Sequence, residues 1–357
     1  QTCVEEADYQ LQWIVKAALY LTKEKGCDIF FSHWHFLDDI NHWHLAHLDP
    51  KWVRYDPNTV QQHWDDVRQA YQAVDRGLAT LMEGVTEDDY VILISDHGCS
   101  PINRIAFMEK FLFDKGFLVL KNPRTPKSTM VENWYDQIDM EKSKVWLHEG
   151  VFLDTFNIYV NAPQGSPEHE EIQRDLIREL RTWVDDKMKQ TVCAFVFSKA
   201  DAELVGLWGD QVGDVVVALE GGYQMGRADS KVAVADNTGH VASGHGRMKP
   251  TYDSTYGTEK AIFVISGPGI KKGYERPAAQ VGHMCLRDVT PTLCHILGIQ
   301  PPAQSQGAII YDLLEGYEIA RQRPNPTPQV EGLTEYKKWF LEHFYVKRLL
   351  TEESIPC

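Results

Sequence analysis

The stretch Tyr90 to Gly98 reads YVILISDHG, an apolar run that ends directly in two potential metal ligands and a glycine. A continuous apolar run of this length is typical of a parallel β-strand that is buried on both faces. Asp96 and His97 then stand at the tip of the strand, where a turn at Gly98 can aim both side chains into one crevice. In open α/β sheets, ligands bind in the crevice beyond the carboxyl ends of the strands. The stretch therefore predicts an α/β fold with a binding site at this strand end.

A second apolar run lies upstream, at residues 28–36 (DIFFSHWHF), and it is also predicted to be a buried strand. Asp38 and His42 follow it with a spacing of four residues. If the chain turns into a helix after the strand, this spacing places both side chains on one face. The sequence thus predicts a second pair of ligands at a strand end.

A third candidate ligand is His245, which stands in Ser-Gly-His-Gly within a loop at residues 238–257. The next predicted strand is 261–266, so this histidine can reach the same edge of the sheet. The three places together supply two carboxylates and three imidazoles, a set of ligands suited to two divalent metals. A single histidine near a strand end is more often structural, and it is the coincidence at three strand ends that favours a metal site.

Several rival residues remain open alternatives. Asp39 adjoins Asp38, and His240 competes with His245 for the late ligand position. Four further histidines make the early region His-rich: His33 and His35 are expected to pack inside the strand, and His44 and His47 are candidates to line the pocket. Residues 99–104 resemble the Cys-x-Pro-x-Arg motif of sulfatases, but the arginine comes one residue late, and we interpret the stretch as a coincidence.

The composition limits the range of partners. Lys and Arg total 36 against 51 Asp and Glu, a net charge of −15, which argues against a nucleic-acid polymer or an anionic membrane. A small phosphorylated substrate stays possible because bound metals reverse the field locally. The seven cysteines include no Cys-x-x-Cys, so we expect a reducing, cytoplasmic compartment. No apolar run reaches the roughly 20 residues that span a bilayer.

The motifs in their order resemble a known family. Asp-x-x-Asn-His after a strand, Ser-Asp-His-Gly after another, Gly-His-Gly before AIFVISGPGIKKG, and DVTPTLCHILGI are similar to the alkaline phosphatase superfamily, in its type I phosphodiesterase/nucleotide pyrophosphatase branch. The likeness covers roughly residues 25–315. It implies an alkaline-phosphatase-like α/β fold, with a mainly parallel sheet flanked by helices and an inserted smaller α+β lobe.

The expected organisation follows from this resemblance and from the alternation of strands and helices. Residues 1–100 and 240–315 are expected to form the metal-binding core. Residues 101–239 are expected to hold the inserted lobe and further core elements, and 316–357 a C-terminal extension with a helix. Helices are also predicted at residues 5–25 and within 57–83. A further helix is predicted from Ser166, an N-cap followed by Pro167, to about Lys187.

The resemblance implies a role for each candidate ligand. Asp38, His42 and His245 would hold one divalent ion, and Asp96 and His97 would hold a second. Zinc is the expected metal, with manganese or iron as alternatives. The implied reaction is hydrolysis of phosphodiester or pyrophosphate bonds in nucleotide-type substrates, through a covalent intermediate on Thr or Ser. That nucleophile and one more Asp have no counterpart in residues 1–27, so both are expected on a segment upstream of Gln1.

Two other functions remain open. The same metals suit a phosphomonoesterase or phosphonate hydrolase, which is a second enzymatic hypothesis. A hypothesis of another class is a catalytically silent metal-binding fragment or subunit. Residues that bind the substrate are not identified by the sequence.

Overall fold

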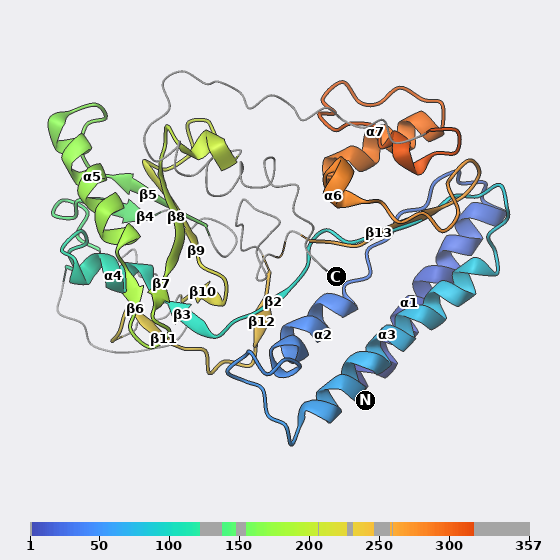
Figure 1. The fold of residues 1–357 in the computed structure, drawn as a ribbon, viewed down its shortest axis with the longest axis horizontal. Helices are drawn as coiled ribbons and strands as arrows, with labels where there is room; N and C mark the ends of the chain where they lie inside the picture. Colours follow the sequence, from blue (N-terminus) through green and yellow to red (C-terminus); the bar gives the residue numbers. More distant parts are fainter. Residues whose placement is uncertain are drawn as a thin grey trace. The chain divides into compact units, whose positions relative to one another are not determined.

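The computed structural model describes residues 2–121, 138–147, 155–205, 207–226, 231–245, 258 and 260–317 (Figure 1). The chain divides into two compact units. The first unit comprises Gln1–Leu78 and His97–Lys260, and the second comprises Ala79–Asp96 and Ala261–Cys357. Most of the predicted C-terminal extension, including its helix, lies outside the described residues.

The first unit opens with a pair of packed helices. Helix α1 (Thr2–Leu19) continues into a π-helical turn (Tyr20–Glu24), as predicted for residues 5–25. Helix α3 (Val60–Met82) lies beside it and confirms the helix predicted within 57–83 (Figure 1). Leu11 of α1 packs against Ala73 and Val74 of α3, because each helix has one apolar stripe to bury.

The segment 28–36 is not a strand, and this prediction was wrong. Two of its apolar side chains face solvent, with Ile29 70% and Phe31 83% exposed. A strand exists only where a neighbour supplies ladder hydrogen bonds, and no strand of the described residues pairs with this segment. Helix α2 (Phe36–His44) begins at its end and is followed by a 3-10 turn (Leu45–His47).

Among the described residues, the largest sheet has four strands in the order β4-β5-β9-β8, and all its pairs are antiparallel. The strands are β4 (Val145–Leu147), β5 (Thr155–Val160), β8 (Cys193–Ser198) and β9 (Val215–Leu219). Helix α5 (Pro167–Arg181) packs on this sheet through Ile172, Leu176 and Leu180. It starts as predicted, since the Ser166 side chain accepts a hydrogen bond from the His169 N–H. Helix α4 (Met108–Asp114) joins the same core.

Short strands complete the first unit. Strand β2 (Ser100–Pro101) pairs with β12 (Ser243–Gly244). Strand β3 (Arg104–Ala106) lies between β10 (Tyr223–Met225) and β11 (Val234–Asp236). A small hairpin joins β6 (Val184–Asp185) to β7 (Gln190–Thr191), and a 3-10 turn covers Ala202–Val205.

The second unit pairs β1 (Val91–Ile94) with β13 (Phe263–Ser266), and both strands were predicted. Helices α6 (Ala278–Val281) and α7 (Val289–Ile296) follow, with 3-10 turns at Leu286–Asp288 and Tyr311–Leu313.

The protein is therefore a mixed α/β protein with several small sheets, and the expected mainly parallel sheet is not found among the described residues. Of their strand pairs, β3 with β10 is parallel and the rest are antiparallel. The expectation rested on the resemblance, on the alternation of strands and helices, and on two apolar runs that were interpreted as buried parallel strands. One of these runs is not a strand, and the other, β1, pairs antiparallel with β13. Within the described part of the chain, no helix is long and apolar enough to cross a membrane.

Candidate metal centre

Helix α2 brings Asp38 and His42 together. Residues four apart lie on the same face of a helix, and the His42 Nε2 atom is 3.1 Å from the Asp38 Oδ2 atom. The opposite side of α2 is fixed by Ile40, which is buried against Val67 and Ala70 of α3. The apolar side of this short helix thus orients its two polar side chains.

A pair of two-residue strands brings His97 and His245 together. His245 directly follows β12, whose partner β2 begins three residues after His97. Their imidazole rings stack with centroids 3.7 Å apart. Gly98 is required at this place, because its N–H donates to the Thr258 carbonyl and an added Cβ would lie 2.5 Å from the Lys260 carbonyl oxygen. Such a contact is too short for any residue but glycine.

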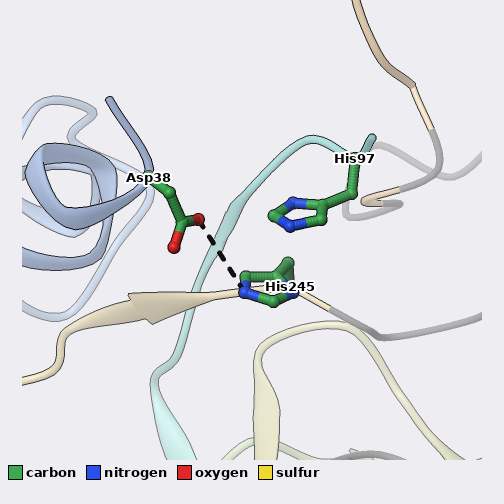
Figure 2. A group of neighbouring side chains, drawn as sticks. All are labelled: Asp38, His97 and His245. Carbon is green, nitrogen blue, oxygen red and sulfur yellow. Dashed lines mark ion pairs between the residues drawn. The ribbon is translucent and has the colours of Figure 1, made fainter. Parts of the chain in front are cut away.

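The three segments converge on one point (Figure 2). Asp38, His97 and His245 each offer a ligand atom, and these atoms lie within 4.8 Å of one another. His245 Nε2 is 3.8 Å from Asp38 Oδ1, and all three residues are partly buried. With His42 beside Asp38, four of the five predicted ligands form what we call the candidate metal centre. One carboxylate among three imidazoles is a donor set that suits zinc and similar divalent ions.

Ser243 holds the two halves of the centre together, and sequence reasoning missed it. The His42 Nδ1 atom lies 2.6 Å from the Ser243 carbonyl oxygen, so an N–H at Nδ1 donates to it. This bond leaves the lone pair on Nε2, the nitrogen that faces Asp38, as is common in metal-ligating histidines. The buried Ser243 hydroxyl also accepts a hydrogen bond from the Ala46 N–H at 2.9 Å. The strand that leads to His245 is thereby tied to the helix of Asp38 and His42.

His35 lies in a different place from the one that the sequence predicted. It was expected to pack inside a strand, but it stands at the start of α2 with a side chain that is 60% exposed. Its Nε2 atom is 3.4 Å from Asp38 Oδ2, and its Nδ1 atom is 3.5 Å from Asp39 Oδ2. The helical spacing of three and four residues would have signalled these contacts if the helix start had been placed correctly.

The remaining candidates lie elsewhere. Asp96, the fifth predicted ligand, precedes His97 at the boundary between the two units, and His240 is exposed. The structure places Asp38 rather than Asp39 with the three histidines. His44 and His47 lie with His63, away from the candidate metal centre. Arg104, the arginine of the sulfatase-like stretch, is engaged in a buried ion pair.

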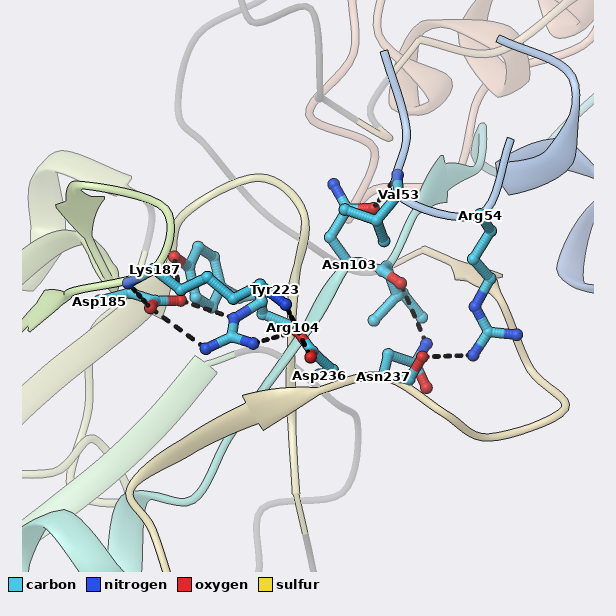
Figure 3. A network of polar contacts seen from close by, with 10 residues as sticks. Val53, Arg54, Asn103, Arg104, Asp185, Lys187, Tyr223, Asp236 and Asn237 are labelled. Atoms are coloured by element: carbon cyan, nitrogen blue, oxygen red, sulfur yellow. Dashed lines mark hydrogen bonds and ion pairs between the residues drawn. The ribbon is translucent and has the colours of Figure 1, made fainter. Parts of the chain in front are cut away.

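That ion pair belongs to a polar cluster that we call the Arg104 network (Figure 3). Arg104 binds Asp185 through two hydrogen bonds, at 2.7 Å from Nε and 3.1 Å from Nη2, and also pairs with Asp236. Tyr223 donates to Asp185 at 3.0 Å, and Lys187 pairs with Asp236 at 2.7 Å. Every charge in the network has an opposite charge beside it.

The network continues toward β12 through Asn103 and Asn237 (Figure 3), since the Asn237 N–H donates to the Asn103 carbonyl at 3.0 Å. Asn237 donates to the carbonyls of Ile102 and Val241 at 3.0 Å each. Arg54 donates to the carbonyl of Gly239 at 2.7 Å. These bonds fix the segment that runs from β11 to Ser243 and His245.

Comparison with known families agrees with the motifs. A profile of the type I phosphodiesterase/nucleotide pyrophosphatase family matches residues 5–247, more than half of the chain. The chain belongs to this family. The type I phosphodiesterase/nucleotide pyrophosphatase family is a hydrolase family of the alkaline phosphatase superfamily, and its members are typically metal-dependent. All five predicted ligands lie within the matched stretch. No curated protein sequence matches the chain significantly.

Proposed function

We propose that this protein hydrolyses phosphodiester or pyrophosphate bonds of nucleotide-type substrates with the help of two divalent metal ions. The observation that carries the proposal is the convergence of Asp38, His97 and His245 within 4.8 Å, in a chain of this hydrolase family. The protein carries a net charge of −15, which repels a small anionic substrate. Cations in the site would reverse the field locally and allow such a substrate to bind.

We assign Asp38, His42 and His245 to one ion, and Asp96 and His97 to the second, with zinc as the expected metal. The donor set of carboxylates and imidazoles fits such ions. When bound, the ions would supply Lewis acidity at the phosphoryl oxygens and at the attacking and leaving oxygens. The side chains would hold the ions. The Ser243 carbonyl orients one of them, because its bond to His42 Nδ1 leaves His42 Nε2 facing Asp38.

We also propose that the nucleophilic Thr or Ser and one further carboxylate come from a segment outside residues 1–357. The serine hydroxyl that lies next to the centre, that of Ser243, is fully buried and bonded to the Ala46 N–H, so it is not placed for attack. Trapping the covalent intermediate and mapping it by mass spectrometry would test this. A labelled residue within this chain would contradict the external nucleophile. The cytoplasmic location expected from the cysteines likewise remains a proposal.

The substrate class is tested by one comparison of rates. The complete gene product, loaded with Zn²⁺ or Mn²⁺, would be assayed with bis-p-nitrophenyl phosphate and p-nitrophenyl phosphate side by side. We expect the diester to be hydrolysed with the higher kcat/KM. A strong preference for the monoester would instead establish the phosphomonoesterase alternative. Metal binding without turnover of either substrate would favour a silent metal-binding subunit.

A further inference from the structure

A second group of histidines lies where the end of α2 meets α3. It consists of His44, His47 and His63 with Asp66, and we call it the α2–α3 histidine cluster. The Nδ1 atoms of His44 and His63 face each other at 2.9 Å. The Asp66 Oδ2 atom is 4.0 Å from His44 Nδ1, and the ring of His47 stacks on His63 with centroids 4.2 Å apart.

This cluster is distinct from the candidate metal centre. His42 and His44 are two residues apart in α2, which places them about 200° apart around the helix axis. His42 therefore points toward Asp38, and His44 points to the other side, toward α3. His63 and Asp66 are three residues apart in α3 and share one face of that helix. The cluster is built from two facing helices, a common origin of metal sites in helical proteins.

The geometry of the pair limits the charge of its two rings. Two protonated rings would place N–H groups against each other, so the Nδ1 to Nδ1 distance of 2.9 Å between His44 and His63 requires that at least one ring is neutral. Two neutral rings whose nitrogens meet at 2.9 Å share a single proton between them. When a divalent ion takes the place of that proton, the proton moves to the Nε2 atom of the same ring, and both Nδ1 lone pairs are then available to the ion.

We propose that His44, His63 and Asp66 form a third divalent-cation site of the zinc class, with water as the remaining ligand. Two nitrogens on one tetrahedral zinc, each at about 2.0–2.1 Å, lie about 3.3 Å apart, slightly more than the distance between the two Nδ1 atoms here. The Asp66 side chain is 36% exposed, so an ion has a path from solvent and the carboxylate has room to turn toward it. His47 is left out of the ligand set, because its ring stacks on the face of the His63 ring, with centroids 4.2 Å apart, and does not meet its Nδ1 edge.

Such an ion would join the C-terminal end of α2 to the first turns of α3. Helix α2 carries Asp38 and His42, so the ion fixes the element on which the candidate metal centre is built. This role is structural and does not require the proposed hydrolysis.

The test uses a chain in which the candidate metal centre is already removed. The complete gene product with Asp38→Ala, His97→Ala and His245→Ala removes ligands of both proposed ions. This triple variant would be reconstituted with Zn²⁺ alone and dialysed, and its zinc content measured. We expect the triple variant to retain one zinc ion per chain, and to lose it when His63→Ala is added. His47→Ala is the matched control, since it removes a ring of the same cluster but no ligand, and zinc is retained. Zinc should also raise the Tm of the triple variant but not that of the quadruple variant with His63→Ala.

If His63→Ala prevents folding, Asp66→Asn replaces it, because it keeps the shape of a partly exposed side chain. Asp66→Asn should weaken zinc binding by at least the about tenfold that loss of an outer ligand partner costs. Zinc content and affinity that are unchanged by His63→Ala and Asp66→Asn would overturn the site, as would a triple variant that binds no zinc. A wild-type chain that binds no more zinc than the triple variant would instead contradict the proposed function and leave this site standing.

Discussion

The Arg104 network and the candidate metal centre are both polar, partly or fully buried regions of the first unit, but their charges are balanced differently. In the network, Asp185 and Arg104 are 3% and 6% exposed, and each lies beside a side chain of opposite charge. In the candidate metal centre, the carboxylate of Asp38 is surrounded by imidazoles, which are ligands in their neutral form.

The difference indicates a structural role for the network and a metal-binding role for the centre. The charges of a buried ion pair with two hydrogen bonds are already balanced, so the network stabilises the fold. In the candidate metal centre, ligand lone pairs converge where, among the described residues, no permanently positive side chain lies, and such an arrangement attracts a cation. Breaking the network should therefore cost stability, whereas breaking the centre should cost metal and activity. The following predictions test that division.

The largest effect on folding is expected from Arg104→Met. It leaves the Asp185 carboxylate buried without its cation, and such a change costs about 3–5 kcal/mol of unfolding free energy. Urea unfolding monitored by circular dichroism measures this. Arg68→Met is the matched control, because Arg68 makes an exposed ion pair with Asp65 and should change stability by about 0.5 kcal/mol or less.

If Arg104→Met lowers the unfolding free energy by less than about 1 kcal/mol, the Arg104 network does not stabilise the fold as proposed. Zinc content gives a second check, since Arg104→Met should leave it unchanged below the unfolding transition.

The next effect is expected from His245→Ala. Outer partners of metal ligands contribute about 10–100-fold, so removal of a ligand itself should lower kcat/KM by more than about a hundredfold. The exposed His240 provides the control, and His240→Ala should leave kcat/KM and metal content unchanged. Equal losses in both variants would show that the assignment of the late ligand is wrong.

Ser243→Ala tests the connection between the two halves of the centre. The substitution keeps the carbonyl that orients His42 but leaves the buried Ala46 N–H without its acceptor. We expect metal binding to weaken about tenfold and the unfolding free energy to fall by about 1–3 kcal/mol. Isothermal titration with Zn²⁺ measures the first effect. Unchanged zinc affinity in a destabilised protein would reduce Ser243 to a purely structural role.

The smallest effect is expected in the pH dependence of stability. Burial opposes ionisation of Asp185, but hydrogen bonds from Arg104, the Lys187 N–H and Tyr223 outweigh it and lower the pKa of this carboxyl. The folded pKa thus lies below the unfolded one, so the contribution is present above the ordinary pKa of 3.8 and is lost as the pH falls through the folded value. Acid unfolding of Arg104→Met should be less steep than that of the wild type. Parallel curves would contradict the assignment.

Local patterns of the sequence predicted much of the centre. The spacing of Asp38 and His42 indicated a shared helical face, and the strand-end positions of His97 and His245 indicated a common edge. Helix α5 was recognised by its Ser166 cap, since capping depends on residues a few positions apart.

Features that depend on distant pairing were missed. An apolar run such as 28–36 predicts a strand only if another strand lies beside it, and the run itself does not contain that information. The Ser243 group that binds His42 is a backbone carbonyl, which every residue type has, so the sequence could not indicate this bond. The meeting of His44 with His63 depends on how α2 and α3 pack, which the histidine count alone does not reveal.

The most direct test compares two neighbouring carboxylates. Asp38→Ala and Asp39→Ala would each be measured for zinc content, hydrolysis of bis-p-nitrophenyl phosphate and unfolding free energy without metal. We predict that Asp38→Ala loses bound metal and activity together, with metal-free stability changed by less than about 1 kcal/mol, and that Asp39→Ala, 45% exposed and outside the centre, retains both. Unchanged metal content in Asp38→Ala, or equal losses in the two variants, would contradict the account.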